Sequence, residues 1–145
     1  MAEKVVIRQD DQFRTLFLSA DPEDIHSEAL EVVEDIHQLT PYGMLLSSLG
    51  SCTALVLHTY AQNHDIALSE VEISLEYQRV FREDCEDCDE DSSYDEEIHE
   101  TLAFKGELNA AEHEKLKRVA HYCPIYKMLQ KGIRIKTRMA EDSAD

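Results

Sequence analysis

Cys52 lies in a sequence setting that could support thiol chemistry. Its neighbours Leu49, Leu55 and Val56 are apolar, so one interpretation is a small buried hydrophobe. The other interpretation is a reactive thiol beside an apolar binding surface. A thiol in the middle of a helix is far from the helix end whose dipole would lower its pKa, and burial raises that pKa. The residues around Cys52 leave both interpretations open.

Cys123 lies in a different setting, directly before Pro124. Proline suits the first position of a helix, so Cys123 is expected to cap one, with backbone N–H groups near its sulfur. Such a position lowers the pKa of a thiol. The alternative is a boundary residue chosen for packing. His121, two residues earlier, either tunes this thiol or is a partly exposed residue at a helix end.

Cys85 and Cys88 form a single C-x-x-C pattern inside the acidic segment 82–97. A structural zinc site needs four ligands, and His99 and His113 do not follow at zinc-finger spacing. The neighbouring carboxylates raise the pKa of these thiols, which opposes redox attack, but they favour a bound cation. The two cysteines are therefore weak candidates for a metal site, and the alternative is a solvated acidic loop.

A long apolar helix must position Cys52. Thr40 and Pro41 have the residue types of a helix cap and a first helical position. Residues 42–61 are apolar or small on nearly every side, which predicts a buried helix. Gly50 costs about 1 kcal/mol of helix propensity relative to alanine. We expect a second helix, of this chain or of another subunit, to cross closely at this glycine.

The remaining elements alternate between strands and helices. Segment 70–78 alternates apolar and acidic residues, which predicts a strand with one buried face. A helix is expected from the Asn109 cap to Cys123, and a short one from Pro124 to Lys131, closed by Gly132. The other expected strands are 5–7, 13–18, 29–36, 98–106 and 133–139. This order predicts an α+β fold, an antiparallel sheet with helices on one face.

The chain has 145 residues and a net charge of −17, which suggests a single domain, residues 1–139, with a frayed acidic tail, 140–145. The charge repels phosphates, so nucleic acid and anionic membranes are not expected partners. The sequence is expected to contain no membrane span, because it has no run of about 18 apolar residues. The N-terminus lacks a secretory signal. We therefore expect a cytoplasmic protein with reduced cysteines.

Two segments resemble the signatures of the OsmC/Ohr family, the osmotically inducible and organic-hydroperoxide-resistance proteins. Residues 40–54, TPYGMLLSSLGSCTA, are similar to the central-helix signature, and residues 121–129, HYCPIYKML, to the second cysteine motif. The loop 84–88, DCEDC, is similar to one in the broader OsmC-like branch. The likeness covers most of residues 40–135.

The resemblance implies a fold and a chemistry. The fold is an intertwined homodimer, with antiparallel sheets packed around two long central helices. The chemistry is thiol-dependent reduction of organic hydroperoxides in oxidative-stress defence, without an organic cofactor. The residue matching Cys52 attacks the peroxide and becomes a sulfenic acid, and the one matching Cys123 resolves it as a disulfide. Dithiols, notably lipoyl groups, then reduce that disulfide.

The sequence departs from the family at the group that activates the thiol. A thiol of pKa about 8.5 is only about 3% thiolate at pH 7, and lowering the pKa to about 6 requires about 3.4 kcal/mol. The family uses an arginine held by a glutamate nine or ten residues upstream, where this chain has Tyr42 and Gly43. Of the two N-terminal arginines, Arg8 and Arg14, we favour Arg14, and the Tyr42 hydroxyl could orient an arginine.

Two other hypotheses remain open. One is a non-enzymatic OsmC-like protein that binds an apolar ligand or a metal, which the missing glutamate supports. The other is a scaffold dimer whose two buried thiols are inert.

Overall fold

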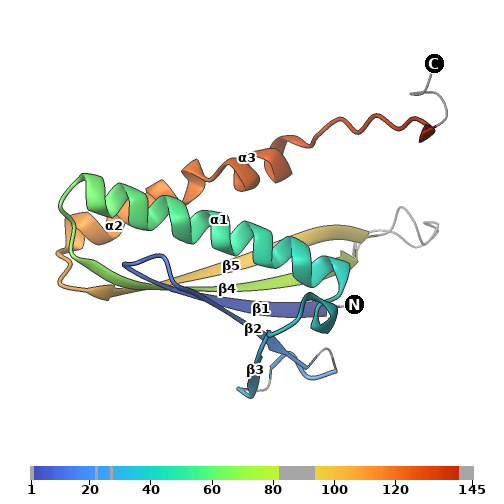
Figure 1. The fold of residues 1–145 in the computed structure, drawn as a ribbon, viewed down its shortest axis with the longest axis horizontal. Coiled ribbons are helices and arrows are strands. Elements are labelled where there is room, and N and C mark those ends of the chain that lie inside the picture. Colours follow the sequence, from blue (N-terminus) through green and yellow to red (C-terminus); the bar gives the residue numbers. More distant parts are fainter. Residues whose placement is uncertain (1, 22, 27, 82–93, 141–145) are drawn as a thin grey trace.

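A computed structural model describes residues 2–21, 23–26, 28–81 and 94–140 of the chain. Within these residues, five strands form one sheet in the order β3-β2-β1-β4-β5, and every neighbouring pair is antiparallel. The helices lie together on one face of that sheet (Figure 1). The predicted α+β architecture is confirmed.

Strands β1, β4 and β5 are longer than predicted, while β2 has the predicted length but begins two residues later than the expected strand 13–18. The strand bounds are Ala2–Asp10 (β1), Thr15–Ala20 (β2), Leu30–Val32 (β3), Leu68–Phe81 (β4) and Tyr94–Gly106 (β5). The start of β5 corrects the prediction that the acidic loop extends to residue 97. Arg79 of β4 lies directly opposite Glu96 of β5, and opposite charges across a ladder favour pairing. β3 is shorter than the predicted strand 29–36, because a 3₁₀ turn begins at Ile36.

The long helix α1, Pro41–Asn63, begins where the sequence predicts. The Thr40 side chain accepts a hydrogen bond from the Gly43 N–H, and Pro41 occupies the first turn. One side of α1 packs on β1 and β4, while Ser48, Leu55 and Thr59 are exposed. In the single chain the helix therefore buries one face, rather than all of its sides.

Gly50 is buried against the sheet, which corrects the expectation that a second helix crosses there. A Cβ atom at this position would lie 2.5 Å from Ile7 Cγ1 and 2.7 Å from Leu75 Cδ1. These side chains belong to β1 and β4, the two central strands. The absence of a side chain at Gly50 thus lets α1 lie close on the sheet that supports Cys52.

By length and composition alone, α1 is the one helix of the described chain that is apolar enough to cross a membrane. The expectation that the chain has no such apolar stretch is therefore wrong for this segment. Ten residues of α1 are buried, among them Leu46, Leu57 and His58. Burial on a sheet accounts for its apolar composition, since a core helix passes the same test.

Two further helices follow the sheet and complete the helical layer. α2, Ala110–Val119, begins with a capping box between Asn109 and Glu112. A 3₁₀ turn, Ala120–Tyr122, leads into α3, Pro124–Lys131, and both the turn and α3 contact α1. The second predicted helix accordingly ends before Cys123, and the short one begins at Pro124 as predicted.

The predicted last strand, 133–139, forms no strand in this chain. The segment extends away from the body of the molecule beyond α3 (Figure 1). Ile133, Ile135 and Met139 are 65%, 82% and 63% exposed. Its apolar–basic alternation is that of a strand, but a strand needs a neighbour for its backbone hydrogen bonds, and no strand of the described chain lies beside it.

Candidate active site

Cys123 caps the N-terminus of α3, as the sequence predicts. Its side chain is fully buried, and its sulfur accepts a hydrogen bond from the Tyr126 N–H at 3.5 Å. Pro124 fixes the first helical turn behind it. The Cys-Pro pair therefore holds a sulfur at the positive end of a helix, and the end of that helix faces α1.

Cys52 lies on the side of α1 that receives α3, and its thiol contacts that of Cys123. The Cys123 thiol and the Ile125 N–H both lie close enough to the Cys52 sulfur to shift its pKa. Both cysteines are free thiols. The fold thus brings together two cysteines that are far apart in the sequence. The contact lies at the N-terminus of α3.

The surroundings of Cys52 favour its protonated form. Burial raises the pKa of the Cys52 thiol, and the Cys123 thiol raises this pKa further. The Ile125 N–H acts in the opposite direction, since an amide donor stabilises the thiolate. Among the described residues, no lysine or arginine contributes to this balance. Within the described residues, the thiol pair therefore has no cation beside it that would activate Cys52.

The structure does not bring Arg14 together with the two thiols. Arg14 follows the turn between β1 and β2, where its Nε donates to Asp10 Oδ2 at 2.7 Å. Its side chain is 75% exposed. Arg8 donates to Glu72 at 2.7 Å. Because its strand neighbour Ile7 is buried beneath α1, Arg8 faces the opposite side of the sheet.

A different arginine, which the sequence analysis missed, meets the Tyr42 hydroxyl. Arg79 of β4 donates from its Nε to the Tyr77 hydroxyl at 3.4 Å, and Tyr77 and the nearby Tyr42 hydroxyl raise the pKa of its guanidinium. Tyr42 stacks on Tyr77 with ring centroids 4.5 Å apart, and the Tyr77 hydroxyl donates to Glu96 at 2.6 Å. The available signal was the alternation of strand 70–78, which continues to Arg79 on the same face as Tyr77.

Arg79 does not reach Cys52 in this chain. Tyr42, which contacts Arg79, precedes Cys52 by ten residues, and ten residues of helix span about 15 Å. Arg79 therefore lies near one end of residues 42–52 of α1, and the thiol pair lies near the other end.

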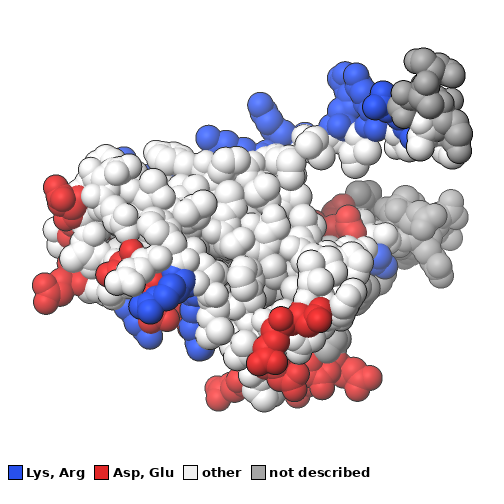
Figure 2. All heavy atoms as spheres, in the orientation of Figure 1, with Lys and Arg blue, Asp and Glu red and all other residues white. Residues whose placement is uncertain are grey.

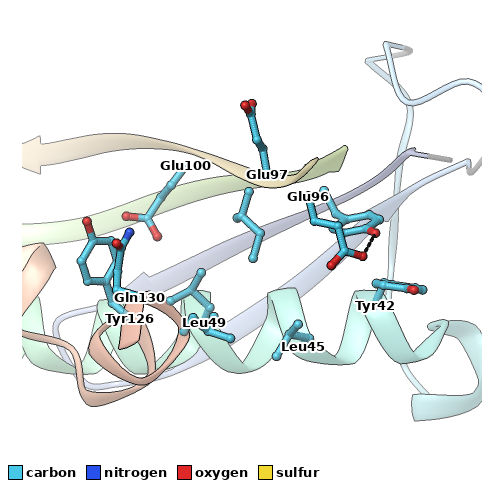
Figure 3. A pocket seen from close by; sticks show the side chains of 11 residues that line it. Tyr42, Leu45, Leu49, Glu96, Glu97, Glu100, Tyr126 and Gln130 are labelled. Atoms are coloured by element: carbon cyan, nitrogen blue, oxygen red, sulfur yellow. Dashed lines mark hydrogen bonds between the residues drawn. The ribbon is translucent and has the colours of Figure 1, made fainter. Parts of the chain in front are cut away.

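A cavity of about 380 Å³ extends along this stretch of α1, between β5 and α3 (Figure 3). Leu49, one helical turn before Cys52, lines it together with Tyr126, whose N–H bonds to Cys123. Its lining consists of aliphatic side chains, three tyrosines, three glutamates and one glutamine: Leu45, Leu49, Ile98, Leu129, Tyr42, Tyr77, Tyr126, Glu96, Glu97, Glu100 and Gln130. Neither cysteine lines the cavity, but residues adjoining both do.

The possible metal ligands Cys85 and Cys88 lie outside the described residues. In the ranges that the structure describes, no group of three histidine, cysteine or acidic side chains could hold a metal ion. His121 stacks on Tyr126 with ring centroids 4.6 Å apart, so it packs on the first turn of α3.

These features define a class: a two-layer α+β protein in which a thiol on the central helix meets a second thiol at a Cys-Pro helix start. The chain belongs to the OsmC-like protein family, whose sequence model matches residues 34–138. The fold is similar to that of an OsmC-like hydroperoxide resistance protein from Jannaschia sp. CCS1. The TM-score is 0.58 at 10% identity, over 95% of this chain and 93% of that one. No curated protein sequence matches the chain.

Proposed function

We propose that this chain is a thiol peroxidase that reduces organic hydroperoxides. The observation that carries the proposal is the contact between the Cys52 and Cys123 thiols at the N-terminus of α3. A sulfenic acid formed on one sulfur would meet the other sulfur without a large rearrangement. Membership of the OsmC-like family and the hydroperoxide resistance named for the similar structure support the same chemistry.

The proposed cycle balances in three steps. The Cys52 thiolate attacks a peroxide oxygen, the O–O bond breaks, and the products after protonation are an alcohol and the Cys52 sulfenic acid. The Cys123 thiol then attacks the Cys52 sulfur, which releases water and leaves a disulfide. An external dithiol then reduces the Cys52–Cys123 disulfide and is itself oxidised to a disulfide. We propose that this dithiol is a reduced lipoyl group. We place this cycle in the cytoplasm, where such reductants keep thiols reduced.

We further propose that the working unit is a homodimer, in which the partner subunit supplies the missing cation. The exposed segment 133–139 supports this, because Ile133 and Ile135 leave large apolar surfaces in water. Arg134, Lys136 and Arg138 alternate with them, and Figure 2 shows basic side chains along this extension. Such a segment suits pairing with the sheet of an acidic second copy. The basic residues would also bring cations to the partner's surface.

Peptide mapping after one equivalent of cumene hydroperoxide tests the cycle. We expect a Cys52–Cys123 disulfide, and turnover when a dithiol is added. Cys123→Ser should stop at a sulfenic acid that dimedone traps, and Cys52→Ser should consume no peroxide. Cys85→Ala with Cys88→Ala is the matched control and should retain turnover. Wild-type turnover no faster than that of Cys52→Ser would reject the enzymatic proposal.

The raised pKa of Cys52 favours one second candidate, a non-enzymatic protein that binds an apolar ligand in the cavity beside α1. Native mass spectrometry distinguishes the candidates. A retained small molecule without any peroxide turnover would favour the binding protein.

A further inference from the structure

The proposed thiol cycle uses none of the three glutamates that line the cavity beside α1, and Glu100 differs from the other two. Glu100 of β5 lines the cavity, and its Oε2 atom is buried without a hydrogen-bond partner among the described residues. Figure 3 shows its carboxyl group pointing toward Tyr126 and Gln130 of α3. A buried acceptor left without a donor costs about 1–3 kcal/mol. A ligand that donates a hydrogen bond there would remove that cost.

The other two glutamates of the cavity already have partners. Glu96 accepts from the Tyr77 hydroxyl at 2.6 Å, and Glu97 Oε2 lies 2.7 Å from His99 Nε2. Figure 3 shows the Glu97 side chain pointing away from the cavity. Glu100 is therefore the carboxyl group available to a ligand, and Glu97 is a natural control.

The charge around the cavity acts against anions. Three glutamates line it, and no lysine or arginine is among the lining residues that the structure describes. Burial raises the pKa of Glu100, because the site disfavours the charged form of this carboxyl group. The same desolvation acts on any negative group that a ligand carries into the site. Arg79, near the Tyr42 end, is engaged by Tyr77 and by the Tyr94 ring.

We propose that Glu100 makes this cavity selective for uncharged apolar molecules that carry a hydroxyl or hydroperoxyl group, and against apolar anions. The O–H of the ligand donates to Glu100, and its apolar part lies along Leu45, Leu49 and Ile98. Glu100 is thus a specificity residue for the substrate that we propose for this protein. The inference rests on the proposed peroxidase function for its biological meaning, but ligand binding tests it separately.

Calorimetric titration of the full-length Cys52→Ser protein with three eight-carbon probes tests the proposal. The probes are 1-octanol, octanesulfonate and octylammonium, at one pH and ionic strength. We expect 1-octanol to bind at least tenfold more tightly than octanesulfonate. Glu100→Gln removes the charge and keeps a hydrogen-bond acceptor. It should therefore reduce the ratio of the 1-octanol affinity to the octanesulfonate affinity several-fold. Glu97→Gln removes an equal charge whose side chain points away from the cavity, so it should narrow the ratio much less than Glu100→Gln does.

Several results would overturn the proposal. These are equal binding of 1-octanol and octanesulfonate, no binding of 1-octanol, or a ratio that Glu100→Gln does not change. Octylammonium binding tenfold more tightly than 1-octanol would show a cation site instead. Cumene hydroperoxide turnover by the wild-type chain is measured in parallel. If the protein turns over cumene hydroperoxide but does not prefer 1-octanol to octanesulfonate, only the proposed role of Glu100 is rejected. If it shows this preference but no turnover, only the proposed peroxidase function is rejected.

Discussion

The pH dependence of Cys52 alkylation tests both the surroundings of its sulfur and the proposed role of a partner subunit. A thiol with a pKa of about 8.5 is about 3% thiolate at pH 7. Burial and the Cys123 thiol raise the pKa of Cys52 in the single chain, so less than about 3% is expected there. Because the thiolate is the nucleophile, alkylation should accelerate as the pH rises and level off above the pKa.

Comparing the wild-type chain with a full-length variant that cannot pair its tails isolates the contribution of the partner. In Ile133→Asp/Ile135→Asp the substituted side chains are exposed in the single chain, so the fold should be unaffected. We expect this variant to have an alkylation midpoint above 8.5. A partner cation that supplies about 3.4 kcal/mol would lower the wild-type midpoint by about 2.5 pH units relative to the variant, and so would greatly increase the thiolate fraction at pH 7.

The assay is iodoacetamide labelling at a series of pH values, with the Cys52 peptide quantified by mass spectrometry. Analytical ultracentrifugation of both proteins reports their association state. Cys123→Ala should lower the midpoint in the variant, because it removes a neighbour that raises the pKa of Cys52. A variant midpoint at or below pH 7 would refute the assignment of burial as the dominant effect. Equal midpoints in a dimeric wild type and a monomeric variant would refute the partner cation.

Three further changes test how the fold supports the site. Gly50→Ala should destabilise the protein by about 1–3 kcal/mol in urea unfolding, because the new Cβ would lie 2.5 Å from a β1 side chain. The exposed Ser48→Ala, on the same helix, should change stability little. Asn109→Ala should cost about 1 kcal/mol by removing the capping box of α2. Burial and the Glu96 carboxylate raise the pKa of Tyr77, so ultraviolet titration should show a phenol that ionises above pH 10 and disappears in Tyr77→Phe.

Local sequence signals predicted the helix starts of this protein. Thr40 and Asn109 cap the helices that the sequence assigns to them, and Cys123 caps α3. These signals are reliable because a cap is satisfied within one turn by backbone atoms close in sequence. The two cysteine motifs likewise identified the family before the fold was known, and its sequence model matches residues 34–138.

Interactions between distant segments followed only from the tertiary structure. No local signal pairs Tyr42 with Arg79 in place of Arg14, because the packing of β4 against α1 is what brings Arg79 near Tyr42. It also could not distinguish Glu100, facing the cavity, from its many acidic neighbours. Segment 133–139 shows the same limit, since its alternation encodes a strand but not the neighbour that would pair with it. Alternation, capping and composition are local properties, whereas the proximity of Cys52 to Cys123 depends on how α3 packs on α1.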